Sequence, residues 1–275
     1  MMPEGLAAFW GLRDRELLSA GLVVAEGRLL ALRLLEAAVR TKAESDGPPA
    51  PGLAGLPGPR FEAIALACVP SLEAELSPLA EGLCPLFVLP EAELAGLAGY
   101  PFHRGVLGLG RRLPSPAFDP GLLPASGPSR LLILPATIDP ENLGAMTRSA
   151  AALGYAAILA GEGTCDPLSR RALRVSMGGA LKLPFFRIEG PGVLEDLCLL
   201  GYGLAAAVLD SGAALLSAWK APPRLGLLIG NEYEGLGREW LPEKVVRLTI
   251  PMEAGSDSLN AAAAAAIFLY EASRA

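Results

Sequence analysis

The sequence predicts an α/β protein with two domains joined by a proline-rich linker. Short apolar runs alternate with helical patterns along the whole chain. After residue 131 these runs become almost continuously apolar, which is typical of strands buried on both faces of a parallel sheet. Residues 111–130 hold five prolines and separate the two patterns. We therefore expect a small α/β domain at 1–110, a linker at 111–130 and a parallel-sheet domain at 131–275.

In the first domain, strands and short helices are expected to alternate. The spacing of apolar residues predicts strands at 21–27, 61–69 and 85–89 and another after residue 105, with helices at 28–40, 72–79 and 91–97. The remaining residues before position 21 read as helical. Proline and glycine punctuate residues 41–60, which predicts a mobile loop there.

The second domain shows regular βα units. Strands are expected at 131–134, 155–159, 185–188, 204–209, 225–229 and 246–250, with helices at 142–153, 168–177 and 193–200. The chain ends in an alanine-rich helix that polar residues 258–260 would open, and alanine lets such a helix approach its neighbours closely. Ligands of parallel sheets bind at the carboxyl ends of the strands, so the loops there are the first place to seek a site.

Composition narrows the classes of function. A net charge of −6 argues against a broadly basic nucleic-acid-coating protein, although a local basic surface stays open. With a single histidine, His103, histidine-based triad chemistry is almost closed off. The four cysteines lack C-x-x-C spacing, which favours reduced thiols in the cytoplasm over disulfides or a zinc site. We expect no metal, no signal peptide and no membrane span, because no apolar run approaches ~18 residues.

Three loops of the second domain carry polar residues at predicted strand ends. In the first, Asn142 stands where a helix N-cap is expected and Arg148 follows about two turns later. In the second, glycines that begin at Gly230 permit close backbone approach to a ligand, and Glu232 could orient an arginine. In the third, residues 258–260 offer a hydroxyl and an amide at a helix start. Taken singly, each loop is also compatible with plain capping or a turn.

Together, the loops resemble the three motifs of the SpoU/TrmH family of RNA 2′-O-ribose methyltransferases, in the SPOUT superfamily. The matching stretches are N-L-G-A-x-x-R-S-A from Asn142, G-x-E-x-E-G-L from Gly230, and I-P-M at 250–252 followed by S-L-N at 258–260. Residues 174–184 also resemble the family's segment between the first two motifs. More weakly, residues 25–27 and 102–105 resemble its domain similar to ribosomal protein L30e.

This resemblance implies a parallel-sheet SPOUT domain with a deep trefoil knot, preceded by a small L30e-like RNA substrate-binding domain. It also implies an S-adenosylmethionine site and a homodimer in which each subunit completes the other's active site. The implied residues fall into three groups: a catalytic set of Asn142, Arg148, Glu232, Ser258 and Asn260; a cofactor set of Gly230, Ile250, Met252 and Leu259; and RNA-binding candidates Arg104, Arg170, Arg171 and Arg174, with Arg111 and Arg112 as further candidates.

The expected reaction methylates a ribose 2′-hydroxyl of structured RNA, tRNA or rRNA. The family's first-motif arginine is proposed as its base, but arginine is effectively always protonated in proteins. We therefore expect Arg148 to bind an RNA phosphate and stabilise the developing alkoxide, with Asn142 positioning it and Glu232 fixing its orientation. The sequence departs from the family at Ala262, where a hydroxyl is sometimes present, and at Ala254, where glycine is common.

Two other readings remain. A catalytically inactive RNA-binding paralogue, such as a ribosome-assembly factor, would share the fold, but the complete catalytic set argues against it. A nucleotide-dependent dehydrogenase is not supported, because no G-x-G-x-x-G opens a helix after a strand.

Overall fold

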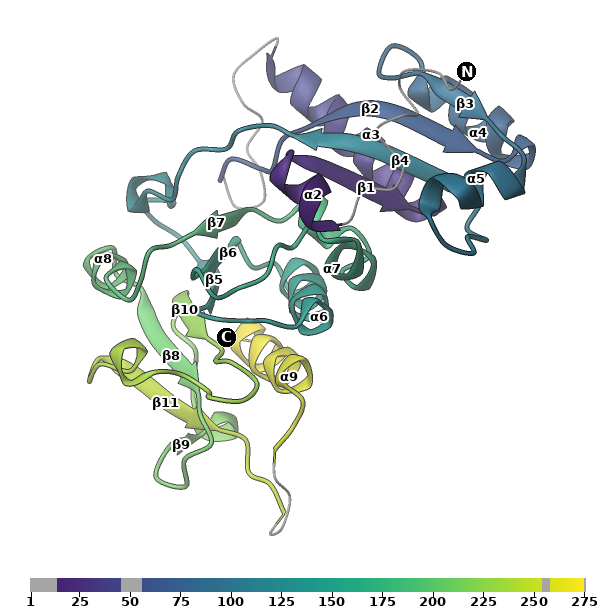
Figure 1. Ribbon diagram of the computed structural model, residues 1–275. Helices are drawn as coiled ribbons and strands as arrows, with labels where there is room; N and C mark the ends of the chain where they lie inside the picture. Colours follow the sequence, from purple (N-terminus) through teal and green to yellow (C-terminus); the bar gives the residue numbers. More distant parts are fainter. Residues whose placement is uncertain (1–13, 46–55, 254–257, 275) are drawn as a thin grey trace. The chain divides into compact units, whose positions relative to one another are not determined.

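The computed structural model describes residues 14–45, 56–253 and 258–274, which fall into two compact units (Figure 1). Unit 1 comprises residues 1–50, 59–115 and 166–182, and unit 2 comprises residues 51–58, 116–165 and 183–275. Residues 166–182, which the sequence placed in the second domain, thus pack within unit 1. None of the helices in the described ranges is long and apolar enough to cross a membrane.

Unit 1 is built on a four-stranded sheet in the order β1-β4-β2-β3. Its strands are β1 (Leu22–Glu26), β2 (Phe61–Cys68), β3 (Leu86–Val88) and β4 (Val106–Arg112), and β4 runs antiparallel to both β1 and β2. Its helices are α2 (Asp14–Ser19), α3 (Arg28–Ser45), α4 (Pro70–Ala80), α5 (Glu91–Ala98) and α7 (Arg170–Val175).

Alternation along the strands gives this sheet two apolar faces. In β1, Val24 packs with α2 and α5 on one face, whereas Val23 and Ala25 pack with α3 on the other. Leu173 of α7 belongs to the α3 side, which explains why residues 166–182 join unit 1. The predicted strands and helices of this unit are confirmed to within a few residues.

One expectation for this unit is wrong: α3 continues to Ser45, into the stretch expected to be a loop. Thr41 explains the extension. Its buried hydroxyl donates to the Ala37 carbonyl oxygen at 2.9 Å and accepts from the Phe61 N–H at 2.9 Å, which ties the end of the helix to β2. Residues 46–55 of that predicted loop, and residues 1–13, lie outside the described residues.

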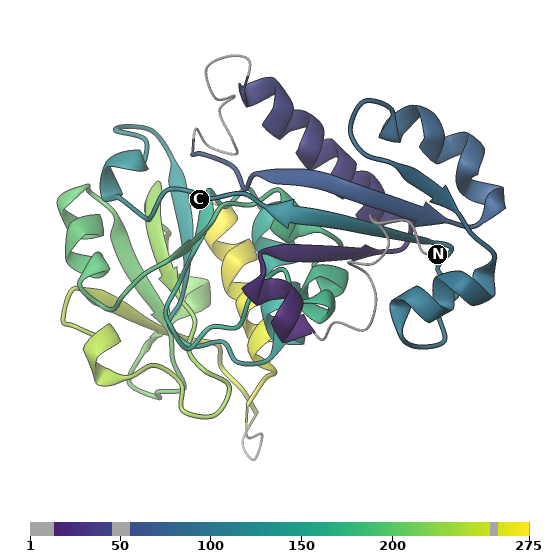
Figure 2. The same ribbon diagram turned by 45° about the horizontal axis from the view of Figure 1, so that its top comes forward.

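Unit 2 is built on a parallel seven-stranded sheet in the order β7-β6-β5-β10-β8-β11-β9, which confirms the predicted class (Figure 2). The strands are β5 (Ser129–Leu134), β6 (Ala157–Ala160), β7 (Phe185–Arg187), β8 (Gly203–Ala207), β9 (Ala214–Leu215), β10 (Arg224–Leu228) and β11 (Val245–Thr249). The short edge strand β9 was not predicted. It pairs with β11 through only Ala214 and Leu215, too short a run to show a period.

Helices cover both faces of this sheet, as the continuous apolar strands require. Leu132 and Leu134 pack with α6 (Pro140–Ala152) and α9 (Ala261–Ser273), whereas Leu131 and Ile133 pack with α8 (Val193–Leu199). Because all strands are parallel, the segments that follow β8, β10 and β11 emerge at one edge of the sheet. That edge holds the candidate site.

Tyr155 is fully buried in the core between α6 and α9, and we expect it to lower the stability of the protein at alkaline pH. Burial raises its pKa, and its hydroxyl donates to the Leu269 carbonyl oxygen at 3.5 Å. In an unfolded chain tyrosine ionises near pH ~10, so above that pH only the unfolded state gains the charge and stability falls. Tyr155→Phe is expected to change stability at pH 7 by no more than about 1 kcal/mol and to move the alkaline unfolding midpoint to higher pH. Unchanged alkaline unfolding, followed by circular dichroism, would contradict this.

Candidate active site

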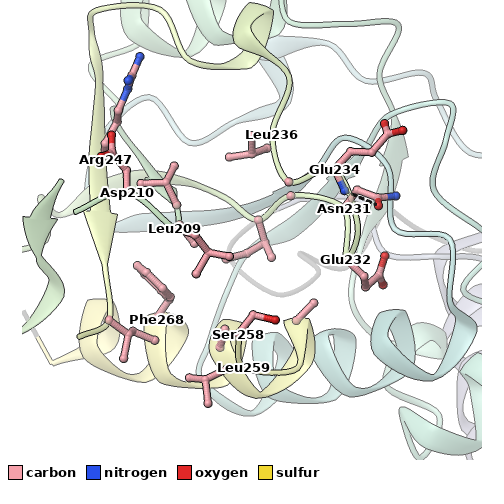
Figure 3. Close-up of a pocket in the computed structure, with 18 of the residues that line it drawn as sticks. Leu209, Asp210, Asn231, Glu232, Glu234, Leu236, Arg247, Ser258, Leu259 and Phe268 are labelled. Carbon is pink, nitrogen blue, oxygen red and sulfur yellow. Dashed lines mark hydrogen bonds between the residues drawn. The ribbon is translucent and has the colours of Figure 1, made fainter. Parts of the chain in front are cut away.

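A cavity of about 400 Å³ lies at the carboxyl edge of the unit 2 sheet (Figure 3). Most of its lining comes from residues 207–210 at the end of β8, from 229–236 after β10, and from Ile250, Met252, Ser258 and Leu259 with the α9 helix after β11. Its middle is apolar, with Leu209, Leu236 and Phe268 facing it, and its polar groups stand towards the ends (Figure 3). This size and pattern are typical of a small-molecule site.

The loop after β10 is shaped by Asn231. Its Oδ1 accepts from the N–H groups of Tyr233 (2.8 Å) and Glu234 (3.3 Å), and its Nδ2 donates to the Ala136 carbonyl oxygen at 3.0 Å. The backbone of Asn231 exchanges two hydrogen bonds with Gly235 across a tight turn. The loop is therefore fixed to the segment after β5, so the backbone at Gly230 and Glu232 has a defined position.

Three predicted catalytic residues are joined in one hydrogen-bonded chain. Asn260 Nδ2 donates to Asn142 Oδ1 at 3.0 Å, and Asn142 Nδ2 donates to Glu232 Oε1 at 2.9 Å. These residues come from α9, α6 and the β10 loop, separated by up to 118 positions in the sequence. A link between three such distant residues is what a prearranged site requires.

Asn142 is not the N-cap of its helix, contrary to the expectation. Asp139 caps α6 by accepting from the Glu141 N–H at 2.9 Å, and Pro140 occupies the first turn, where proline is favoured. The Asn142 side chain is therefore released from capping and lies buried in the chain with Glu232 and Asn260. Asn260 does cap α9, since its Oδ1 accepts from the N–H groups of Ala262 and Ala263.

Arg148 stands apart from the other predicted catalytic residues. It is exposed, and the described residues provide no hydrogen-bond or ion-pair partner for it. Six helical steps of ~100° place it about 120° around α6 from Asn142, and it does not line the cavity. The Glu232 carboxylate contacts Asn142 rather than this arginine.

The predicted cofactor residues do come together. Gly230, Ile250, Met252 and Leu259 all line the cavity, as do Glu232 and Ser258. Gly230 is required for space, because a Cβ there would lie 2.4 Å from the Gly235 carbonyl carbon. Ala262, the departure from the family pattern, lies in the first turn of α9, where its N–H donates to Asn260 Oδ1 and its side chain packs against the core. Ala254, the other departure, lies outside the described residues.

Sequence reasoning missed Leu209, Asp210, Asn231, Arg247 and Phe268, which also line or shape the cavity. Leu209 and Asp210 could have been predicted from the sequence, because they follow a strand expected to be buried in the parallel sheet. The carboxyl ends of such strands lie at one edge of the sheet, where ligands bind.

Most of the predicted RNA-binding arginines are engaged within unit 1. Arg174 pairs with Glu26 at 2.6 Å, and Arg170 pairs with Glu26 at 3.7 Å and Asp14 at 3.4 Å. Burial raises the pKa of Asp14, while its hydrogen bond from the Arg170 N–H opposes that rise. Arg111 and Arg112 pair with carboxylates. Arg104 and Arg171 are exposed, as Arg111 and Arg112 are.

The pairing around Glu26 gives a stability prediction. The Glu26 side chain is 1% exposed, so Glu26→Ala leaves two arginines without their buried counter-charge. We expect a loss of about 3 kcal/mol in the free energy of unfolding, measured by urea titration with circular dichroism. Glu75→Ala is the matched control, because Glu75 pairs with Arg28 on the exposed surface and should matter little. Equal effects of the two substitutions would contradict the assignment.

Comparison with known proteins agrees with this geometry. Residues 129–270 match the model of the SpoU rRNA Methylase family. An uncharacterized tRNA/rRNA methyltransferase of Mycobacterium tuberculosis is 37% identical over 220 residues, which cover 78% of this chain and 75% of that protein.

Two solved structures share the fold. A crystal structure of an RNA 2′-O ribose methyltransferase has a TM-score of 0.74 at 26% identity and covers 98% of this chain and 94% of that one. An AdoMet-bound rRNA methyltransferase from Sinorhizobium meliloti has a TM-score of 0.76 and covers 98% of this chain and 93% of that one. At 22% identity, the second likeness supports the fold alone.

Proposed function

Because this chain belongs to the SpoU rRNA Methylase family, we propose that it transfers a methyl group from S-adenosylmethionine to a ribose 2′-hydroxyl of tRNA or rRNA. The observation that carries the proposal is the chain from Asn260 through Asn142 to Glu232 beside the cavity. A buried polar network is costly when any of its members lacks a hydrogen-bond partner. A protein that only binds RNA has no need for such a network beside a cavity.

The cavity fits the proposed cofactor. Leu209, Leu236 and Phe268 provide apolar surface for an adenine ring. Among the described lining residues the exposed carboxylates Asp210 and Glu234 outnumber the one arginine, Arg247, which favours a ligand with a positive centre. When bound, the cofactor supplies a methyl group on a sulfonium, a leaving group that needs no further activation. The protein must then align the ribose oxygen and remove its proton.

We propose that Arg148 acts in a homodimer, at the site of the other subunit. In its own chain it is exposed, without a described partner and turned away from Asn142. α9, which packs against α6, also exposes two large apolar side chains, Ile267 and Tyr270, at 44% and 56%. We propose that these two helices form a two-fold contact, which would bring the partner subunit's Arg148 towards the cavity. There its guanidinium would bind an RNA phosphate beside the reacting ribose.

The remaining features follow from the same family relationship. We propose that the loops at the cavity edge belong to a trefoil knot and that unit 1 is an L30e-like domain that binds RNA in the cytoplasm. The likeness to the RNA 2′-O ribose methyltransferase structure covers 98% of this chain, so it extends over unit 1 as well as unit 2. For RNA contact within unit 1, the exposed Arg104 is a better candidate than Arg170 and Arg174, because Glu26 already holds the latter two.

Calorimetric titration with S-adenosylmethionine and S-adenosylhomocysteine tests the proposal. We expect both to bind at one site per chain, and Leu259→Asp, which places a charge on the apolar lining, to abolish binding. If neither ligand binds the wild-type protein, the methyltransferase assignment fails and the inactive RNA-binding paralogue becomes the better reading.

A further inference from the structure

We propose that Glu232 is the general base of the reaction and that its Oε2 atom takes the proton from the ribose 2′-hydroxyl. This inference rests on the proposed function, and it replaces the orienting role that the sequence suggested for Glu232. Two observations support it: the direction of the hydrogen bonds that lead to the Glu232 carboxylate, and the absence of a described hydrogen-bond partner for its Oε2 atom.

The backbone fixes the direction of the chain that leads to Glu232. The N–H groups of Ala262 and Ala263 can only donate, so Asn260 must turn its oxygen towards them. Its Nδ2 is then left to donate to Asn142 Oδ1. Asn142 must in turn present its own Nδ2 to Glu232 Oε1. The start of α9 thus sets both amide orientations, and Glu232 receives a hydrogen bond through one oxygen.

The second carboxylate oxygen has no such partner. Glu232 Oε2 is buried and accepts no hydrogen bond from any described residue. A buried acceptor left unsatisfied destabilises the folded state, and more so when it is charged. Glu232 lines the cavity, at the end opposite Asp210 and Arg247 (Figure 3). A hydroxyl group that enters there would donate a hydrogen bond to Oε2. A ribose 2′-hydroxyl can donate such a bond, whereas the 2′-O-methyl ether formed by the reaction has no O–H and cannot.

The other ionisable groups that line the cavity are poorer candidates. Asp210, Tyr233, Glu234 and Arg247 are exposed, and none is hydrogen-bonded to Asn142 or Asn260. Arginine is not a base in proteins. Glu232 alone combines a position on the lining with a fixed orientation and an available acceptor.

The proposed step balances in atoms and charge. As the 2′-oxygen forms its bond to the methyl carbon, its proton moves to Glu232 Oε2. The electron pair of the broken carbon–sulfur bond stays on sulfur, which becomes a neutral thioether. The carboxylic acid then releases the proton to water. Methylation makes the oxygen's proton strongly acidic, so a carboxylate is basic enough to accept it during the transfer.

Glu232→Gln tests the proposal, because it keeps the shape of the side chain. Its oxygen can still accept from Asn142, but the other terminal atom becomes an NH₂ donor. Single-turnover methyl transfer to a mixture of tRNA and rRNA from a strain lacking the gene is expected to fall at least ~100-fold. The affinity for S-adenosylhomocysteine, measured by calorimetry, and the thermal unfolding midpoint should stay close to wild type. Glu243→Gln removes an exposed carboxylate outside the cavity and serves as the matched control.

Chemical rescue separates a base from a residue that only positions the substrate. Added formate should partly restore transfer by Glu232→Ala but not by Asn142→Ala. Three results would overturn the role of Glu232 as the base and leave the proposed function intact. They are a Glu232→Gln transfer rate within tenfold of wild type, no rescue of Glu232→Ala by formate, and loss of S-adenosylhomocysteine binding by Glu232→Gln. A wild-type protein that neither binds the cofactor nor methylates RNA would overturn the proposed function itself.

Discussion

Two inactive variants, Arg148→Ala and Asn142→Ala, are expected to restore activity when their subunits are mixed. Each homodimer should lose at least ~100-fold in methyl transfer, since every site lacks one of the two residues. After exchange, half of the dimers are mixed, and one site in each mixed dimer has both Asn142 from one subunit and Arg148 from the other. About a quarter of wild-type activity should therefore return.

This outcome follows from where α6 places the two side chains. Asn142 is buried and bonded to Glu232, whereas Arg148 is exposed and turned away from it. If Arg148 instead served its own chain, no mixed dimer would hold a complete site, and the mixture would stay as inactive as its components. Analytical ultracentrifugation of the mixture checks that subunits have exchanged, and mixing Arg148→Ala with itself provides the baseline.

Gly230→Ala is expected to weaken S-adenosylhomocysteine binding at least tenfold. A Cβ at this position would lie 2.4 Å from the carbonyl carbon and 2.6 Å from the carbonyl oxygen of Gly235, and 2.7 Å from the Leu236 nitrogen. These are backbone atoms of a loop that Asn231 ties to Ala136, so the loop itself must move. Overpacking of this kind costs about 1–3 kcal/mol, and here the displaced atoms line the cavity.

Gly212→Ala is the matched control for this substitution. A Cβ there meets only Asp210 Oδ1, at 3.4 Å, which is an ordinary contact close to the same cavity. Calorimetry should show near wild-type affinity for this variant. Equal affinities for the two variants would mean that the backbone after β10 does not shape the cofactor site.

The sequence predicted the parallel sheet and most of the site because their signals are local. Apolar runs marked the strands, and the glycines and polar residues at strand ends marked Gly230, Glu232 and the start of α9. What it could not predict depends on contacts between distant segments. Nothing local to Thr41 shows that Phe61 extends α3, and nothing local to Arg170 or Arg174 shows that Glu26 holds them.

The same limit applied to the hydrogen-bonded chain of Asn260, Asn142 and Glu232. Asn142 was expected to cap α6, and only the structure shows that Asp139 takes that task and leaves Asn142 for Glu232. Arg148 was grouped with Glu232 because the family motifs carry both. A motif states which residues are present, but it does not state which chain of an oligomer supplies each of them.

Mapping of ribose methylation is the decisive test of methyl transfer to RNA by this protein. The purified protein is incubated with S-adenosylmethionine that carries a labelled methyl group and with tRNA and rRNA from a strain lacking the gene. The RNA is then digested to nucleosides for mass spectrometry. We expect label in a 2′-O-methylated nucleoside at a defined position, and we expect Glu232→Gln to abolish it. Label found only on a base, or no label in RNA that the protein nevertheless binds, would contradict it.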